Sequence, residues 1–424
     1  MAPSTVLTPA RVRGASRAGG GRPNLAAPVE VEVIMRKSFL TIALLLCWSW
    51  AIPLGAQQPC LGYSIVINTP EDQTILAVNG AENPQEQIDA LDKFTQAHAD
   101  SKFMPCAHEY YTIAYLKMNN YDKVIEHGEQ ALAANHQDVL LMLNVIKAYV
   151  GGGKVSDTAI DVVLKAPEQI NTEANPAKPM DVNEENWQKN LQELGQSAKE
   201  LRAYMAYAFF QLLPRVPDAS KRLVLLDKFA QAFPDAATEH AKAINYQRFL
   251  AYKLAGDMTK VVESGEKVVA EDPGNVEVLN LLAYIYANQR TDLDKASGYA
   301  QKALDLATGM KKPEGVTDAQ FASTQKLQQG MAHLTLGYID FVKVEKTRKV
   351  GPALQELKTA VDLLDENPQL QAQALFYVGN AYEFMSPANH TAAIEALSRA
   401  AGLQSSWQTQ ASDLLAKVKR AARK

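Results

Sequence analysis

The sequence LDKFAQAFPD (226–235) has a near copy, LDKFTQAHAD (91–100), earlier in the chain. The two copies start 226 − 91 = 135 residues apart. This distance is close to a whole multiple of the repeat lengths, roughly 20 to 50 residues, of stacked repeat proteins. The match continues without a gap, since IAYLKMNNYDKVIEHGEQAL (113–132) pairs with LAYKLAGDMTKVVESGEKVV (250–269). Apolar or small residues recur at the helical period in both blocks, so each block is predicted to form a helix, a turn and a second helix.

Small or apolar residues recur at i, i+4 and i+7 on the second helix of five predicted units. These spacings place them on one helix face, where a neighbouring helix can approach closely. The triplets are Val124, Gly128, Ala131; Val261, Gly265, Val268; Ala296, Ala300, Ala303; Ala353, Leu357, Ala360; and Ala393, Leu397, Ala400.

A tyrosine precedes four of these triplets by nine to eleven residues: Tyr115, Tyr252, Tyr286 and Tyr382. In the remaining unit Tyr338 and Phe341 lie nearby. We expect each ring to pack against the small residues of its own hairpin. The sequence therefore predicts an all-α fold of about five to seven stacked antiparallel helix hairpins, an α-solenoid.

This pattern resembles the tetratricopeptide repeat family, whose helix-turn-helix unit runs Leu-Gly-x2-Tyr, Ala-x3-Phe and Pro. The closest segments are 245–273, 279–306 and 375–403. No unit keeps the family's tryptophan, and Gly265 stands where the family has a bulky residue. The resemblance implies a right-handed superhelix that binds a peptide or partner protein in its concave groove, without a cofactor or a catalytic site. The phrase F-x-Q-A-F-P-D is also similar to periplasmic repeat proteins of cell-envelope assembly, and such an assembly factor is the alternative function.

Family geometry places the second, fifth, ninth and twelfth residues of each unit on the inner wall of the superhelix. Aromatic and amide side chains there could stack on, and hydrogen-bond to, an extended ligand. Packing between repeats is the alternative role for Leu250 and Phe376. Carried onto this sequence, the groove positions are Tyr246, Leu250, Lys253, Asn280, Tyr284, Phe376 and Asn380.

The segment MRKSFLTIALLLCWSWAIPLGAQQ, which begins at Met35, has the order of a secretory signal peptide. Basic residues come first, an apolar run follows, and small residues precede an expected cleavage after Ala56. The run is too short for the roughly 20 residues of a spanning helix, so we expect an exported chain without a stable membrane span. Residues 1–34 then reflect a start codon assigned too early. Lipoprotein signals carry a small residue directly before the lipid-bearing cysteine, whereas Leu46 precedes Cys47 here. This argues against a lipid anchor.

Composition separates the remaining segments. Residues 167–185 and 308–319 are rich in Pro, Asn, Gly and charge and are predicted to be loops. The predicted organisation is 1–34 outside the mature protein, 35–56 signal peptide, 57–166 N-terminal repeats, 167–185 loop, 186–404 central and C-terminal repeats, and 405–424 capping helix.

Cys60 and Cys106 are the only thiols left after removal of residues 1–56. A single intramolecular pairing exists for two cysteines, and an oxidising compartment favours it. Two buried free thiols are the alternative, because spacing alone does not show that the sulfur atoms approach.

No catalytic or metal-binding motif is present. VGGGKVS (150–156) lacks the spacing of a phosphate-binding loop, and HEYYT (108–112) lacks the second histidine of a zinc helix. Removing residues 1–56 takes away six basic and two acidic side chains, so the formal net charge falls from −4 to −8. This charge disfavours binding to nucleic acid. An unrecognised enzyme site in 155–245 stays an alternative, as does a lipid or acidic partner for the basic residues at 417–424.

Overall fold

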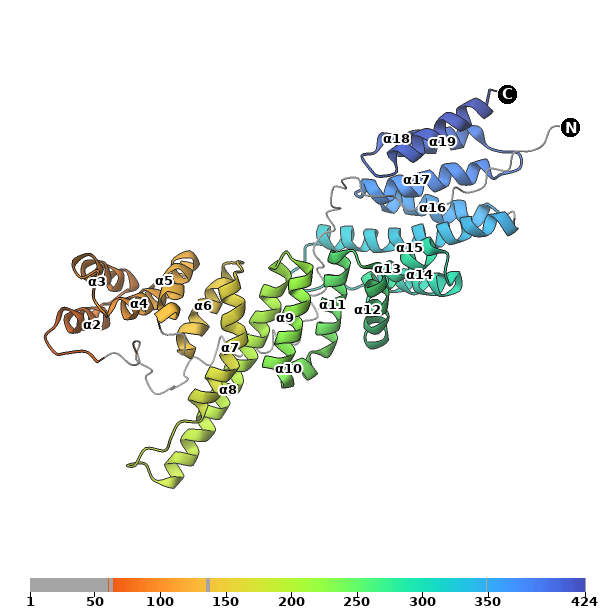
Figure 1. The fold of residues 1–424 in the computed structure, drawn as a ribbon. Coiled ribbons are helices and arrows are strands. Elements are labelled where there is room, and N and C mark those ends of the chain that lie inside the picture. Colours follow the sequence, from red (N-terminus) through yellow and green to blue (C-terminus); the bar gives the residue numbers. More distant parts are fainter. Residues whose placement is uncertain (1–59, 61–63, 135–137, 348, 424) are drawn as a thin grey trace. The chain divides into compact units, whose positions relative to one another are not determined.

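The computed structural model describes residues 60, 64–134, 138–347 and 349–423. These residues form eighteen α-helices and one 3-10 helix, and no β-strand (Figure 1). The helices are α2 (Pro70–Gly80), α3 (Pro84–Ala97), α4 (Met104–Lys117), α5 (Tyr121–Ala134), α6 (Val139–Gly151), α7 (Asp157–Ala174), α8 (Glu184–Leu212), η1 (Leu213–Arg215), α9 (Ala219–Ala232), α10 (Pro234–Glu239), α11 (Ala241–Ala255), α12 (Met258–Glu271), α13 (Val276–Gln289), α14 (Leu293–Thr308), α15 (Asp318–Thr347), α16 (Gly351–Leu363), α17 (Pro368–Glu383), α18 (His390–Gly402) and α19 (Gln408–Ala421). The predicted segments 1–34 and 35–56 lie outside the described residues.

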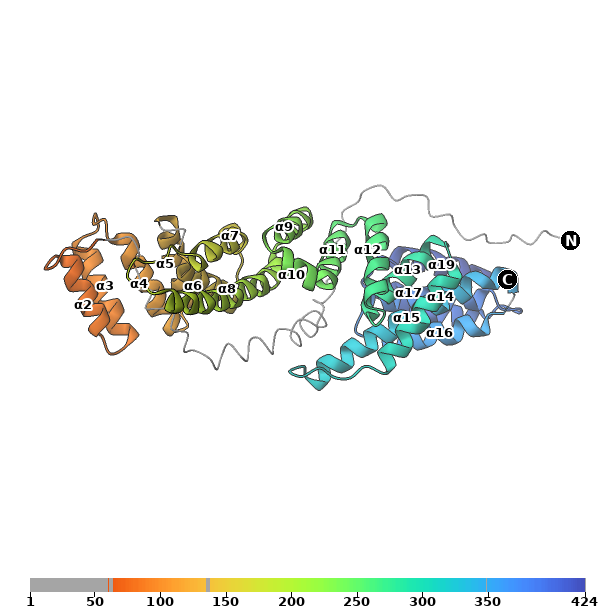
Figure 2. The ribbon, with the colours of Figure 1, turned by 90° about the horizontal axis from the view of Figure 1, so that it is seen from below.

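Neighbours in sequence pack as hairpins. Seven pairs can be read along the described chain: α2 with α3, α4 with α5, α6 with α7, α11 with α12, α13 with α14, α15 with α16, and α17 with α18. The first helices of successive hairpins also touch, as α13 does with α15 and α15 with α17 (Figures 1 and 2). The predicted all-α fold of consecutive helix hairpins is therefore confirmed.

Polar side chains fix where many of the helices begin. Asp257, Asn275 and Asn367 each accept a hydrogen bond from the backbone N–H three residues further on, at the start of α12, α13 and α17. Such caps satisfy amide groups that have no partner inside the helix. Gly256 ends α11 with a φ of 74°, a left-handed conformation that costs glycine little. Short turns with these residues let each helix fold back on the one before it.

The predicted rows of small residues form the contact between the helices. All fifteen members of the five triplets are buried. A Cβ atom on Gly128 would lie 2.3 Å from Cγ2 of Val145 on α6, the first helix of the next hairpin. A Cβ atom on Gly265 would lie 3.0 Å from Leu282 on α13 and 3.3 Å from Phe249 on α11. These two rows thus hold α5 and α12 against their own hairpins and against the next ones.

The tyrosines do not fill the hairpin interiors in the way that the sequence predicts. Tyr115, Tyr252, Tyr286 and Tyr382 are only half-buried. The residues three positions before Tyr115 and Tyr252, namely Thr112 and Phe249, are the ones that face the glycine of the second helix. A side chain three positions further on lies on nearly the same side of the helix, but almost one turn further along its axis. The tyrosine rings therefore lie at the edge of the hairpin and not in its interior.

Helix α7 corrects the predicted loop 167–185. The helix continues through Pro167 to Ala174, and the loop is therefore confined to residues 175–183. Ala166 and Ile170 are buried, so the apolar face of the helix runs past the proline. Proline removes one backbone hydrogen bond, and burial of this face compensates for the loss. Helix α8 follows this loop, and the helix predicted within 405–424 is present as α19.

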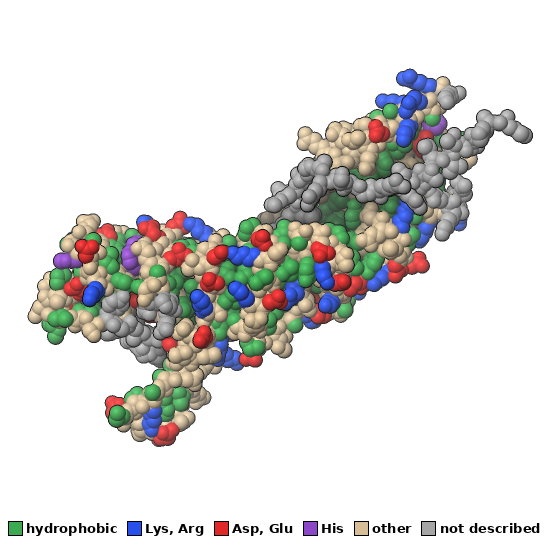
Figure 3. Space-filling model, viewed as in Figure 1, with side chains coloured by type: hydrophobic (Ala, Val, Ile, Leu, Met, Phe, Trp, Pro, Cys, Tyr) green, Lys and Arg blue, Asp and Glu red, His purple; other side chains and the backbone are tan. Residues whose placement is uncertain are grey.

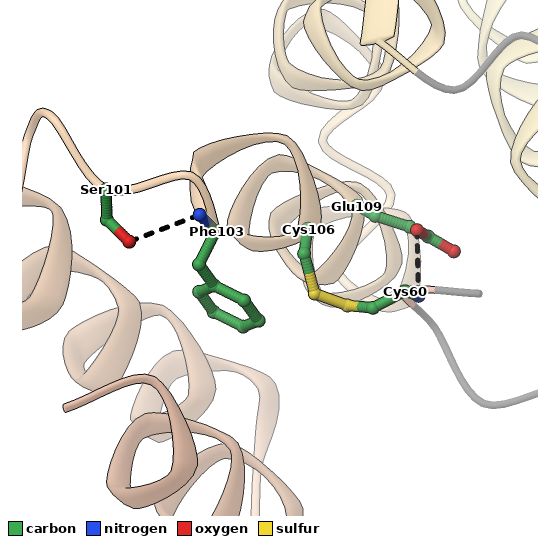
Figure 4. The surroundings of a disulfide bond; sticks show 5 residues. All are labelled: Cys60, Ser101, Phe103, Cys106 and Glu109. Atoms are coloured by element: carbon green, nitrogen blue, oxygen red, sulfur yellow. Dashed lines mark hydrogen bonds between the residues drawn. A yellow bond between two sulfur atoms is a disulfide. The ribbon is translucent and has the colours of Figure 1, made fainter. Parts of the chain in front are cut away.

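Cys60 and Cys106 form a disulfide in the structure (Figure 4). Their Cα atoms are 5.0 Å apart, and Cys106 is fully buried at the start of α4. Glu109, one turn further along α4, accepts a hydrogen bond of 3.0 Å from the backbone N–H of Cys60. The disulfide and this hydrogen bond together fix Cys60 on the first described hairpins.

Glu109 is a buried acid, with 4 % of its surface exposed. Burial, and then the negative charge of Asp138, raise the pKa of Glu109 to about 7. Asp138 is itself buried and caps α6 by accepting a hydrogen bond of 2.8 Å from the N–H of Leu141. Two carboxyl groups therefore share one buried site, which favours a proton on Glu109.

We expect Glu109→Gln to remove a pH dependence of about 2 kcal/mol from the free energy of unfolding between pH 5 and pH 7.5. Folding raises the pKa of Glu109, so the folded chain keeps a proton that the unfolded chain releases. The resulting stabilisation is complete below a pH of about 4.5 and is lost as the pH rises through about 7. The variant does not titrate, so it should gain stability relative to the wild type as the pH rises.

Urea denaturation of both proteins at the two pH values measures this difference. His127 on α5 titrates in the opposite sense, because burial lowers its pKa to about 4. That contribution is the same in both proteins and cancels when their stabilities are subtracted. A stability difference that does not change with pH would contradict the assignment.

Candidate protein-binding surface

The seven groove residues predicted from the sequence lie on three first helices, α11, α13 and α17. Two of them converge on one carboxylate. Tyr246 donates its hydroxyl to Glu277 Oε2 at 2.9 Å, and Lys253 Nζ lies 2.7 Å from Glu277 Oε1. Glu277 belongs to the first turn of α13. The structure thus brings Tyr246 and Lys253 together through a residue that the sequence did not indicate.

Asn280 lies one turn beyond Glu277 on α13 and is fully buried. Its Nδ2 donates to the backbone carbonyl of Gln328 at 3.0 Å and to Oε1 of the same residue at 2.8 Å. Its Oδ1 has no hydrogen-bond partner. Asn280 therefore ties α13 to α15, and one acceptor in that interface stays unsatisfied.

Tyr284 follows Asn280 by one turn and reaches the third first helix. Its hydroxyl lies 3.3 Å from Oε1 of Gln373 on α17, a side chain that is 2 % exposed. Burial raises the pKa of Tyr284, so the phenol stays protonated and can donate this hydrogen bond. Glu277, Asn280 and Tyr284 together form a continuous polar line along α13, which contacts α11, α15 and α17.

The two predicted residues on α17 lie in different surroundings. The ring of Phe376 is 5.1 Å from that of Trp407, directly before α19, and packs against the C-terminal hydrophobic clusters. Packing between units, the alternative that the sequence left open for Phe376, is what this contact shows. Asn380, one turn later, is half-buried, as Leu250 is on α11.

Buried aromatic rings fill the contact between α15 and α17. Tyr377 lies 4.8 Å from Tyr338 and 5.6 Å from Phe341, measured between ring centroids. The ring of Tyr377 also contacts Trp407. These rings therefore hold the first helices α15 and α17 together, next to the half-buried Asn380.

Sequence reasoning missed Glu277, Gln328 and Gln373. Glu277 and Gln373 each lie three residues before a predicted groove residue, so a search at helical spacing would have found them. Gln328 could not be found in this way, because it lies on the long helix α15, for which no unit register was assigned. All three act across helices that are distant in sequence.

Two hollows lie away from the polar line of α13. A cleft of about 280 Å³ between α11 and α12 is lined by Asn245, Arg248, Tyr252, Lys260, Glu263, Ser264 and Lys267. A larger hollow of about 630 Å³ lies beside residues 64–71 and 97–103.

Within the described part of the chain, no group of three or more His, Cys, Asp or Glu side chains could hold a metal ion. None of the helices described is both long and apolar enough to cross a bilayer.

No protein-family model and no curated protein matches the chain. Among solved structures, the chain is similar to the crystal structure of the APC/C hetero-tetramer Cut9-Hcn1, with 11% identity and a TM-score of 0.28, over 84% of this chain and 91% of that one. It is also similar to yeast Tom70, with 12% identity and a TM-score of 0.18, over 84% of this chain and 96% of that one. At these scores the fold assignment rests on the helix contacts within this chain.

Proposed function

We propose that this protein is a non-catalytic scaffold that binds a peptide or partner protein along the first helices of its hairpins. The observation that carries the proposal is the polar line Glu277, Asn280 and Tyr284 on α13, which links the first helices α11, α15 and α17. The tetratricopeptide-like sequence pattern supports the same function. No cofactor is part of this proposal.

The second helices serve a different purpose. Their small residues are buried between helices, where they set the spacing of the hairpins. The buried polar contacts of Tyr246, Asn280 and Gln373 instead hold the first helices in fixed positions relative to one another. Such positioning lowers the entropy cost of binding a chain across several hairpins.

Site-specific photo-crosslinking tests this proposal. A photoreactive amino acid is placed at Leu250 or Asn380 on first helices, and at Glu263 or Ser398 on second helices as matched controls. We expect adducts with one protein from extracts at the first two positions only. Equal yields at all four positions, or adducts confined to the controls, would refute binding along the first helices.

We further propose that the protein is exported and works outside the cytoplasm. The charged, apolar and small segments of residues 35–56 support this location, although they lie outside the described residues. The disulfide between Cys60 and Cys106 supports it too, because disulfides persist in oxidising compartments. N-terminal sequencing of the protein from its native cells should begin at Gln57, and a peptide from residues 1–34 would contradict the proposal.

A further inference from the structure

The end of α19 carries a cluster of basic side chains. Lys417, Lys419 and Arg420 lie in the last turns of the helix, and Arg423 follows in the turn after it. All four are exposed, and Lys and Arg side chains gather at this end of the chain in Figure 3. In the part of the chain that the structure describes, none of the four pairs with an acidic side chain. We call these four residues the basic face.

The basic face lies opposite the side of α19 that packs on the protein. Ala411 and Val418 are buried. Leu414 and Leu415 are half-buried and pack against the hydrophobic cluster that α18 contributes to. At about 100° per residue, Lys417, Lys419 and Arg420 span an arc of roughly 160° on the other side of the helix. The apolar side of α19 is therefore occupied by α18, and the cations point away from it.

The charge of the basic face contrasts with that of the protein. The chain has a formal net charge of −4 and a sequence pI of about 6.0. Asp413, one turn before Lys417, is the only acidic residue on α19, and it makes no ion pair there. A local excess of positive charge on an acidic protein indicates an anionic partner for this end of the chain.

The form of the cluster favours lipid over other anions. Four basic side chains on and directly after one amphipathic helix match the footprint of proteins that bind anionic lipid headgroups. Nucleic-acid-binding domains are instead basic as a whole, and single-strand binders add aromatic rings for base stacking. The basic face holds no aromatic residue. The exposed side of a single helix is convex and offers no pocket for a ligand. A planar bilayer needs no such pocket, because it binds through charge and not through a complementary shape.

We propose that the basic face docks the protein on the surface of a membrane that contains anionic phospholipid. The contact is electrostatic and peripheral, because the apolar side of α19 is buried and cannot insert. Binding to the membrane therefore weakens strongly as the salt concentration rises. This inference is independent of the groove proposed above, since α19 lies beyond the last hairpin.

Vesicle co-sedimentation of the full chain tests the proposal. The probes are vesicles of phosphatidylcholine with about 30% phosphatidylserine, and vesicles of phosphatidylcholine alone. In the test variant Lys417, Lys419, Arg420 and Arg423 are all replaced by glutamine. The matched control replaces four exposed lysines on other helices, Lys93, Lys165, Lys199 and Lys302, by glutamine, so both variants carry the same net charge.

We expect the wild type and the control to prefer the anionic vesicles in low salt. Each basic residue near an anionic surface contributes about a fivefold gain in partition, so the test variant should lose about 100-fold or more. Equal binding by the test variant and the wild type would overturn the proposal. Equal wild-type binding to both kinds of vesicle would also overturn it, as would tighter binding to a DNA oligonucleotide that the test variant loses.

Discussion

Replacement of Phe249 by alanine is expected to lower the free energy of unfolding by about 3 to 5 kcal/mol. The ring is fully buried on α11, and its Cε2 atom lies 3.3 Å from the position of a Cβ on Gly265. Because Gly265 belongs to α12, the ring fills the interior of this hairpin. Its removal leaves a cavity that two packed helices cannot close. Urea denaturation followed by circular dichroism measures the loss.

Tyr252→Ala is the matched control, since it removes an aromatic ring three residues later on the same helix. The ring is half-buried and lines the cleft between α11 and α12, so we expect a loss of about 1 kcal/mol. Losses that are equal, or larger for Tyr252, would mean that the tyrosine fills the hairpin, as the sequence had suggested.

Loss of the disulfide is expected to destabilise the N-terminal hairpins by about 3 to 4 kcal/mol. The bond joins residues that are 46 positions apart, and without it the unfolded chain gains the entropy of that loop. The variant that carries both Cys60→Ala and Cys106→Ala removes it without leaving a single reactive thiol. Thermal unfolding under non-reducing conditions compares this variant with the wild type.

Treatment with a reducing agent provides the control for this prediction. It should lower the stability of the wild type to that of the double variant and leave the double variant unchanged. A double variant as stable as the oxidised wild type would show that the bond does not hold the N-terminal hairpins in solution.

Burial of the small rows could be predicted because it depends on local spacing. A helix face is set by residues three and four apart, so the repeated triplets identified the buried side of five second helices. The C-terminal helix predicted within 405–424 is likewise present, as α19. The same reasoning failed at Pro167, because a proline signals a break only when no buried apolar face continues past it.

The partners of the candidate surface could not be predicted in the same way. Tyr246 and Glu277 are 31 residues apart, and Tyr284 and Gln373 are 89 apart. Such contacts depend on how successive hairpins are placed, which one-dimensional periodicity does not specify. The choice of Phe249 over Tyr252 as the interior ring has the same origin, because it depends on the rotation of α11 about its own axis.

The close packing of helices through small residues is tested most directly by two glycine-to-alanine variants. A Cβ atom on Gly337 of α15 would lie 2.7 Å from Cγ and 2.9 Å from the backbone N of Leu357 on α16, whereas one on Gly298 of α14 would meet nothing within 4 Å. We predict that Gly337→Ala lowers the free energy of unfolding by about 1 to 3 kcal/mol. Gly298→Ala should raise it by about 0.5 to 1 kcal/mol, because alanine favours a helix over glycine. A Gly337→Ala protein that is stabilised as much as Gly298→Ala would contradict the close approach of α15 and α16.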